Sequence, residues 1–194
     1  MAKIFDIELK AVKNYVTATG LPVYQGKVYW KKKAVGSYTE DPNGGSGSLE
    51  VPADVSTEIE DAIRKYYAQY PRLDTLTLYR DYDVEKFVKA RDEGTLPYRN
   101  TEDLDFLIDF FFDELICLSL FEKDWKKAKK KGFSTVVVVE WIGLGGPKPK
   151  GRFEVWQCDG SAKTMEEIKA ESDKIYPAYI LKVYEKAEDF IIAP

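Results

Sequence analysis

Three aspartates, Asp105, Asp109 and Asp113, are spaced four residues apart and are the side chains best suited to do chemistry in this sequence. Carboxylates of this kind can bind Mg²⁺ or Mn²⁺ and support phosphoryl transfer without histidine. Their spacing places them in a row along the flank of a helix, beside its apolar face. Exposed acids on such a flank usually form a solvated helix surface, and we favour this interpretation over a metal site.

Glu40 and Asp41 are a second candidate pair of carboxylates for a metal ion. They stand beside a stretch rich in Gly, Ser, Asn and Pro, residues 41–48, whose composition is typical of an exposed loop. A polar turn is the simpler explanation for this pair. We therefore expect no metal ion and no cofactor, assign no catalytic residue, and favour a binding protein over an enzyme.

Histidine is absent from the sequence. Its absence excludes Ser-His-Asp and Cys-His catalysis and any zinc or iron site that needs histidine ligands. Residues 143–146, Gly-Leu-Gly-Gly, lack the Lys-Ser/Thr pair of a phosphate-binding loop. Cys117 and Cys158 lie far apart in apolar contexts, so we expect two small buried hydrophobic residues in a reducing compartment.

A basic cluster follows Trp125 and consists of five lysines: Lys126, Lys127, Lys129, Lys130 and Lys131. Lysines beside an aromatic residue can hold nucleic-acid phosphates while the ring stacks on a base. Lysines in the last turn of a helix also complement the negative end of the helix dipole. We favour the helix-end explanation, and direct nucleic-acid binding by these lysines stays open as an alternative.

Charge is distributed unevenly along the chain. Residues 1–37 carry a net charge of +5, residues 38–124 carry −12 and residues 125–194 carry +3. A strongly negative region attracts basic surfaces, such as those of nucleic-acid-handling proteins, and speeds association with them. Solubility alone would also explain the acids. The contact residues that we predict for a basic partner are four aspartates: Asp41, Asp105, Asp109 and Asp113.

Residues 1–42 have the pattern of an antiparallel β-meander. Ile7, Leu9 and Ala11 alternate with their neighbours, which favours a half-buried strand. A turn at residues 20–22 leads to a second strand, and a third strand follows a tip at Lys31–Lys33. Lysines at this tip would also discourage pairing with other sheet edges.

Residues 54–131 have the pattern of a mainly helical region. We expect a first helix capped by Ser56 or Thr57 and closed by Pro71. Residues 72–82 are ambiguous, and residues 76–79 fit a short strand as one interpretation. A short helix over residues 84–92 follows. The clearest helix begins at Thr101, and one face of it is apolar: Leu104, Leu107, Ile108, Phe111, Phe112 and Leu115. A further helix is predicted over residues 118–131.

Residues 133–194 predict a β-hairpin, a helix and a strand. The apolar run at residues 134–142 indicates a strand buried on both faces, and residues 152–157 form its partner after a loop at Gly143–Gly151. Thr164 is expected to cap a helix that ends at Ile175. Residues 179–184 then form a strand, and residues 185–192 a helical tail. We therefore predict one α+β domain over residues 1–194, with helices packed on the N-terminal meander.

Two further features bear on location. The first residues, Met-Ala-Lys-Ile-Phe-Asp, do not resemble a secretion signal. The apolar runs are also shorter than the roughly 18 residues that a membrane span needs. We therefore expect a cytoplasmic protein that does not contact membranes.

Parts of the chain resemble a group of small bacterial, plasmid and phage proteins. Residues 7–13, Ile-Glu-Leu-Lys-Ala-Val-Lys, match an opening strand "IELK-x-VK", and residues 40–45, Glu-Asp-Pro-Asn-Gly-Gly, resemble an Asn-Asp-Gly-x-Gly-Gly loop. Residues 115–127 resemble the end of an acidic amphipathic helix and a Lys-Asp-x-Lys-Lys segment. The resemblance covers roughly residues 4–45 and 102–140 of the sequence.

The chain departs from this pattern at the loop. It has Glu40 and Pro42 where the pattern has Asn and Gly, and it lacks a histidine that many relatives carry there. A catalytic role of the loop is therefore not carried over. Members of the group sit on mobile elements, and some are expected to act as anti-CRISPR proteins against Cas9.

The resemblance and the acidic region together predict an accessory protein that inhibits a host defence protein. Its partner would be a basic nucleic-acid-handling protein, such as a Cas9-type nuclease or its ribonucleoprotein. A metal-dependent nuclease, an RNA-binding module and a toxin-immunity protein are the alternatives. Oligomeric state is not predicted.

Overall fold

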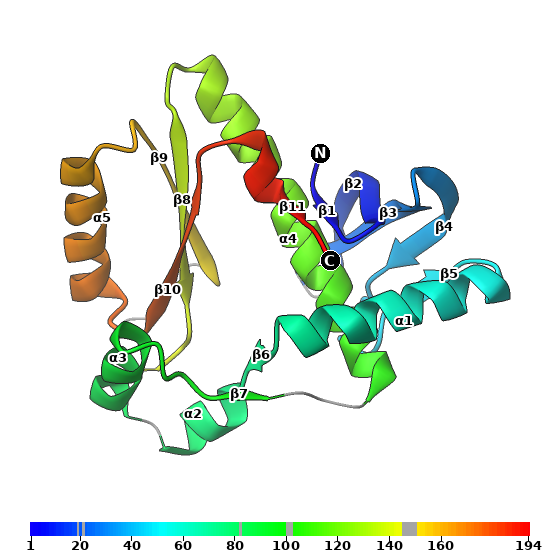
Figure 1. Cartoon of the computed structure of the whole chain (residues 1–194), viewed down its shortest axis with the longest axis horizontal. Helices are drawn as coiled ribbons and strands as arrows, with labels where there is room; N and C mark the ends of the chain where they lie inside the picture. The colour runs from blue at the N-terminus through cyan, green and yellow to red at the C-terminus, as the bar shows by residue number, and fades with distance from the viewer. Residues whose placement is uncertain (19, 21, 82, 100–102, 145–150) are drawn as a thin grey trace. The chain divides into compact units, whose positions relative to one another are not determined.

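The computed structural model describes residues 1–194 except residues 19, 21, 82, 100–102 and 145–150. The chain divides into two compact units built from interleaved segments (Figure 1). Unit 1 comprises residues 1–70, 100–122 and 187–194, and unit 2 comprises residues 71–99 and 123–186. Each unit has its own sheet and helices, and the predicted α+β class is confirmed. The prediction of one domain stays a prediction.

Unit 1 holds a six-stranded sheet in the order β11-β1-β2-β3-β4-β5. Its strands are β1 (Lys3–Ile4), β2 (Ile7–Val16), β3 (Pro22–Trp30), β4 (Lys33–Thr39), β5 (Ser48–Glu50) and β11 (Ile191–Ile192). The predicted meander is confirmed as β2, β3 and β4, which pair antiparallel. At its tip Lys31 and Lys32 have φ of 49° and 70°, the left-handed conformations that a tight two-residue hairpin turn requires. Leu21, in the predicted first turn, lies outside the described residues.

The alternation predicted for β2 ends at Ala11. Its φ is 52°, and the pairing register with β3 shifts between Lys10 and Lys13. This is a β-bulge, which turns the following side chains to the other face. Ala11 is therefore exposed, contrary to the predicted pattern, while Ile7 and Leu9 are buried.

The helices of unit 1 are α1 (Ala53–Gln69), the first part of α4 (Leu104–Lys130) and the 3-10 turn η1 (Ala187–Phe190). Aromatic contacts join α1, α4 and the sheet. Tyr66 meets Phe111 edge to face with ring centroids 5.5 Å apart, and Tyr38 of β4 stacks on Phe112 at 4.2 Å. Such pairs combine a large buried apolar area with a favoured ring geometry. The predicted apolar face of α4 therefore lies in the core of unit 1.

Two predictions about these helices are wrong. Helix α1 begins after Pro52 without a side-chain cap, and the Thr57 hydroxyl bonds the Ala53 carbonyl instead of capping the helix. Helix α4 is one helix of 27 residues and not two, because no Gly or Pro interrupts residues 104–130. Its predicted start, Thr101, lies outside the described residues.

None of the helices that the structure describes combines the length and apolar composition that crossing a bilayer requires.

Unit 2 contains a three-stranded antiparallel sheet with β8 in the centre of the order β10-β8-β9. The elements of unit 2 are β6 (Arg72–Leu73), α2 (Thr75–Asp81), α3 (Val84–Asp92), β7 (Tyr98–Arg99), the end of α4, β8 (Thr135–Trp141), β9 (Phe153–Cys158), α5 (Ala162–Ile175) and β10 (Tyr179–Tyr184). Residues 135–140 are all buried, as predicted for this apolar run. Helix α5 covers one face of the sheet, where Ile168 joins a cluster with Val137 and Val139 (Figure 1).

Three predictions about unit 2 and the C-terminal tail are wrong. Residues 76–79 belong to helix α2, whose first turn is held by Asp74 through the N–H and hydroxyl of Thr77. Helix α5 is capped by Ser161, whose hydroxyl accepts from the Thr164 N–H at 3.3 Å, so the cap lies three residues before the predicted one. The predicted helical tail is a single 3-10 turn followed by β11. Most of the predicted loop at 143–151 lies outside the described residues.

Candidate functional site

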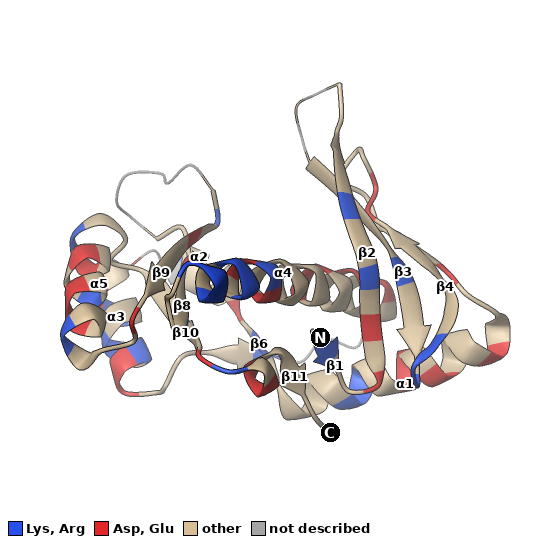
Figure 2. Ribbon diagram, turned by 90° about the horizontal axis from the view of Figure 1, so that it is seen from above, with Lys and Arg blue, Asp and Glu red and all other residues tan. Residues whose placement is uncertain are grey.

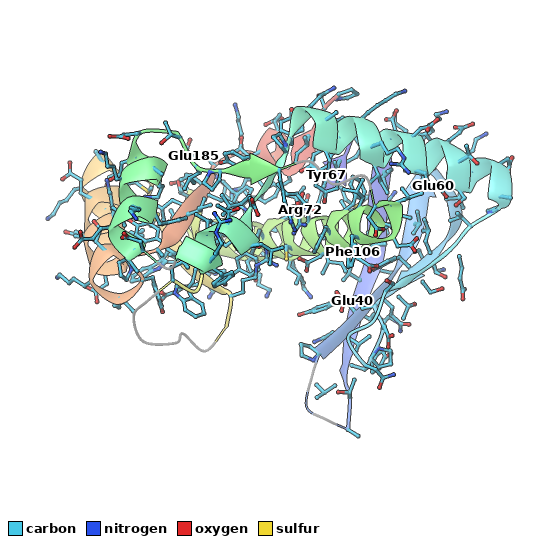
Figure 3. All side chains as sticks on the ribbon, turned by 90° about the horizontal axis from the view of Figure 1, so that it is seen from below. Glu40, Glu60, Tyr67, Arg72, Phe106 and Glu185 are labelled. Carbon is cyan, nitrogen blue, oxygen red and sulfur yellow. The ribbon has the colours of Figure 1, made fainter. Side chains whose placement is uncertain are left out.

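A hollow of about 360 Å³ lies in unit 1, where four segments meet: the end of β4, the start of β3, helix α4 and the loop of residues 41–47, which we call the glycine-rich loop. Four carboxylates line it: Glu40, Asp41, Asp109 and Asp113. We call this hollow the acidic pocket. Glu40 follows β4, below the first turns of α4 in the view of Figure 3. The remaining lining is glycine, proline and apolar or aromatic side chain.

Asp109 ties the glycine-rich loop to α4 and the sheet. Its Oδ1 accepts a hydrogen bond from the Gly47 N–H at 2.8 Å and one from the Tyr38 hydroxyl at 3.3 Å. Tyr38 is 2% exposed, so its hydroxyl needs such a partner. Gly47 is required here because a Cβ at this position would collide with the Tyr38 hydroxyl. The loop is thereby held against the pocket wall.

Glu40 is a pocket carboxylate whose pKa is shifted. Its Oε2 accepts a hydrogen bond from the Tyr24 N–H at 2.8 Å. Burial raises the pKa of Glu40, and the negative charges of Asp113 and Asp109 raise it further, against the opposing effect of the Tyr24 hydrogen bond. The raised pKa of Glu40 therefore reflects its partial burial first and the neighbouring negative charges second.

Two tyrosines report the same negative field. Burial raises the pKa of Tyr38, and the adjacent Asp109 raises it further. Burial likewise raises the pKa of Tyr24, with Glu40 as the next cause. Both phenols therefore stay protonated at neutral pH, which suits hydrogen-bond donors and not nucleophiles or general bases.

Asp41 begins the glycine-rich loop. Its side chain accepts from the Asn43 N–H at 2.7 Å, and its carbonyl accepts from the Gly44 N–H at 3.1 Å. Gly44 has φ of 79°, which a residue with a side chain rarely adopts. These contacts make a tight Asx turn that places the Asp41 carboxylate at the pocket.

The structure brings together three of the four predicted contact residues. Asp41, Asp109 and Asp113 line the acidic pocket, whereas Asp105 is exposed on the first turn of α4 outside its lining. Sequence reasoning placed Glu40 only in a weak metal-binding pair. Its position directly after a strand, next to a loop rich in glycine, is the signal that could have included it.

The acidic charge belongs to unit 1. This unit carries nine basic and eighteen acidic residues, a net charge of −9, and its segment 100–122 has seven acids and no base. Unit 2 carries twenty basic and fifteen acidic residues, a net charge of +5, and within it residues 71–99 balance six acids with six bases. The acidic middle of the sequence is therefore divided between the units, and its excess lies in unit 1.

A second hollow in unit 1 shows how an acid can be neutralised. It has a volume of about 390 Å³ and contains Glu58, which accepts hydrogen bonds from the Trp30 indole at 2.7 Å and the Lys31 ammonium at 2.6 Å. In the acidic pocket, by contrast, the hydrogen bonds described for Glu40, Asp41 and Asp109 come from neutral N–H and O–H groups.

The predicted nucleic-acid-binding lysines belong to unit 2. Lys126, Lys127, Lys129 and Lys130 form the end of α4 and Lys131 follows it, and all five are exposed. Figure 2 shows these basic residues gathered at the C-terminal end of the helix. The predicted glycine-rich segment 143–146 is described only as far as Leu144.

Chemically, the acidic pocket is an array of hydrogen-bond acceptors with negative potential. No group of three or more His, Cys, Asp or Glu side chains is placed to hold a metal ion within the described part of the chain. Ammonium and guanidinium groups are the cations that such acceptors suit, since both donate several hydrogen bonds and neither needs a fixed coordination geometry.

No protein-family model, curated protein or solved structure matches the chain.

Proposed function

We propose that this chain is a binding protein whose acidic pocket receives a lysine or arginine side chain from a basic partner. The observation that carries this proposal is the convergence of four carboxylates from two distant chain segments on one hollow in a unit of net charge −9. Burial raises the pKa of Glu40 and repulsion from Asp113 and Asp109 raises it further, so an incoming cation would relieve an unfavourable interaction as well as form new ones.

The charge of unit 1 also acts before contact. Opposite charges attract over about 8 to 10 Å at physiological ionic strength, and such attraction raises association rates more than it raises affinity. The pocket then supplies specificity, because its aromatic and glycine walls confine the cation beside the acids. An arginine is the better fit, since a planar guanidinium forms paired hydrogen bonds with carboxylates and is weakly hydrated.

The sequence resemblance supports a narrower proposal. We propose a cytoplasmic accessory protein of a mobile element that inhibits a host nucleic-acid-handling defence protein, such as a Cas9-type nuclease or its ribonucleoprotein. The carboxylates would occupy positions where nucleic-acid phosphates otherwise lie. Nuclease activity and toxin immunity, the other sequence-based alternatives, have no structural observation in their favour among the described residues.

Calorimetric titration with a hexa-arginine peptide tests the pocket. The test variant is Asp109→Asn with Asp113→Asn, which removes two charges from the pocket but keeps oxygen acceptors. The matched control is Asp54→Asn with Asp105→Asn, two acids of unit 1 outside the pocket lining. We expect about a tenfold or larger loss of affinity in the test variant and a much smaller loss in the control. Equal losses would show that net charge alone binds the peptide and would overturn the proposal.

A cleavage assay tests the narrower proposal. Purified Cas9 ribonucleoprotein is incubated with the wild-type chain or with the same two variants, and cleavage of target DNA is followed over time. We expect inhibition by the wild type and the control, and weak inhibition by the pocket variant. Full cleavage in the presence of the wild-type chain would refute the proposal that Cas9 is the partner. The peptide titration would then decide whether the acidic pocket binds a cationic side chain.

A further inference from the structure

Five exposed lysines lie at the end of α4. Four of them occupy positions i, i+3, i+4 and i+7, which share one side of an α-helix, and the fifth directly follows the last helical residue; they are Lys123, Lys126, Lys127, Lys130 and Lys131. We call them the lysine stripe. All five belong to unit 2, whose net charge is +5, so the stripe is a separate feature from the acidic pocket of unit 1.

The helix dipole explains only part of this stripe. Favourable interaction of a cation with the dipole is confined to the last turn of a helix. Helix α4 ends at Lys130, so Lys123 and Lys126 lie before that turn. Lys127 pairs with Asp124 at 2.9 Å between half-exposed side chains, and such surface pairs neutralise little.

An aromatic side chain stands directly after the stripe. The helix ends in a Schellman turn: Gly132, with φ of 89°, donates its N–H to the Lys129 carbonyl, and Phe133 donates its N–H to the Ala128 carbonyl. This turn fixes the backbone of Phe133. The apolar contact usual in such a turn would be with Ala128 or its neighbour, yet Phe133 remains 39% exposed. An exposed aromatic residue with a fixed backbone therefore directly follows the lysines in the chain.

We propose that the lysine stripe and Phe133 form a binding surface for single-stranded nucleic acid. From Lys123 to Lys130 the stripe rises about 10 Å along the helix, a distance over which one nucleic-acid strand in B-form geometry places about three phosphates. The lysines bind these phosphates, and Phe133 stacks on a base at the end of the bound segment. Stacking of this kind requires an unpaired base, which is why a single strand fits better than a duplex.

Fluorescence anisotropy with a labelled oligo-dT probe tests the role of the lysines. The variant Lys126→Gln, Lys130→Gln, Lys131→Gln removes three charges from the stripe. Its control, Lys163→Gln, Lys169→Gln, Lys174→Gln, removes three exposed charges from α5 in the same unit. We expect the stripe variant to bind about tenfold or more weakly and to lower the slope of log affinity against log salt by about two, because about 0.7 counterions are released per single-strand phosphate contact. Equal losses in both variants would overturn the proposal.

The variant Phe133→Leu tests stacking, since leucine keeps an apolar side chain at this position but has no aromatic ring. We expect about a five- to tenfold loss of affinity for oligo-dT and no loss for an abasic oligonucleotide of the same length. An equal effect on both probes, or none on either, would overturn the stacking role. Thermal unfolding of each variant shows whether it folds. If Phe133→Leu does not fold, the lysine variants, which change only surface residues, decide whether the proposal stands.

Vesicles of phosphatidylcholine and phosphatidylserine separate nucleic acid from an anionic membrane. Binding to these vesicles that depends on the stripe, together with failure to bind oligo-dT, would overturn the proposal. The pocket variant Asp109→Asn, Asp113→Asn should bind oligo-dT as the wild type does. The lysine stripe and the acidic pocket can therefore fail independently.

Discussion

Asp109 links a buried tyrosine to a loop through one carboxylate oxygen, which accepts from the Tyr38 hydroxyl and from the Gly47 N–H. Asp109→Ala leaves both donors without this partner, and we expect a loss of about 1–3 kcal/mol in the free energy of unfolding. Asp109→Asn retains an oxygen acceptor, so its stability should stay close to that of the wild type. Urea unfolding of both variants is the measurement. Equal destabilisation would mean that the charge, and not the hydrogen bonds, holds the loop.

We expect Glu40 to lower the free energy of unfolding as pH rises. Its pKa is raised in the folded protein by burial and by Asp113 and Asp109, so the folded state holds the proton above pH values at which the unfolded state has lost it. Stability therefore falls with increasing pH from the ordinary pKa of 4.5 up to the raised pKa. Glu40→Gln removes this dependence and should raise the melting temperature at pH 7 but not at pH 4. A melting temperature at pH 7 below that of the wild type would contradict this prediction.

The candidate site was only partly predictable at the level of residues. The four-residue spacing placed Asp109 and Asp113 on one helix flank, and α4 keeps them there. Pairing them with Glu40 required knowing that β4 ends beside α4, which depends on the stacking of Tyr38 on Phe112. No local pattern encodes such a contact between segments about 70 residues apart in the sequence.

At the level of elements, Glu140 joins the three strands of unit 2. It lies on the central strand β8 and is 7% exposed, with the Lys182 ammonium of β10 at 2.7 Å and the Arg152 guanidinium, which precedes β9, at 2.8 Å. Burial opposes ionisation of Glu140, but Lys182 and Arg152 outweigh it, and the pKa of this carboxyl is lowered.

Glu140→Gln should therefore destabilise unit 2. Because the folded pKa is lowered, the ion pairs contribute stability above the ordinary pKa of a glutamate, and this contribution is lost as pH falls through the folded value. We expect a loss of about 1–3 kcal/mol at pH 7, and a smaller loss near pH 3. Chemical unfolding at the two pH values measures it, with Glu166→Gln on the exposed side of α5 as control. A loss that did not depend on pH would show that the charge of Glu140 is not what matters.

The elements that sequence could predict were those with an unambiguous hydrophobic period. The apolar run of β8 and the apolar face of α4 are examples, because the pattern of apolar residues in each predicts its burial and the structure buries both. The bulge at Ala11 was not predicted, since Ile7, Leu9 and Ala11 alternate with their neighbours as far as the bulge itself. Residues 76–79 alternate like a strand, but Asp74 starts a helix there by accepting from Thr77. Local hydrogen bonds decided between two structures that the pattern allowed.

At the scale of the whole molecule, charge separates by structural unit and not by sequence third. Unit 1 is acidic and unit 2 basic, although the segments of the two units alternate along the chain. The proposed site for a cationic partner therefore belongs to the acidic unit and the proposed site for an anionic partner to the basic unit. A nucleoprotein particle presents both kinds of surface, so the proposed partner class and the proposed nucleic-acid surface are compatible within a single complex.

Occupation of the acidic pocket by a cation can be measured directly through the pKa of Glu40. An NMR titration of the Glu40 side-chain carboxyl in the full chain, without and with saturating hexa-arginine, gives this value in both states. A guanidinium in the pocket favours the ionised carboxylate, so we expect the pKa of Glu40 to fall from its raised value when the peptide is bound. An unchanged pKa under conditions where the peptide is bound would contradict the central claim, because the cation would then lie elsewhere on the protein.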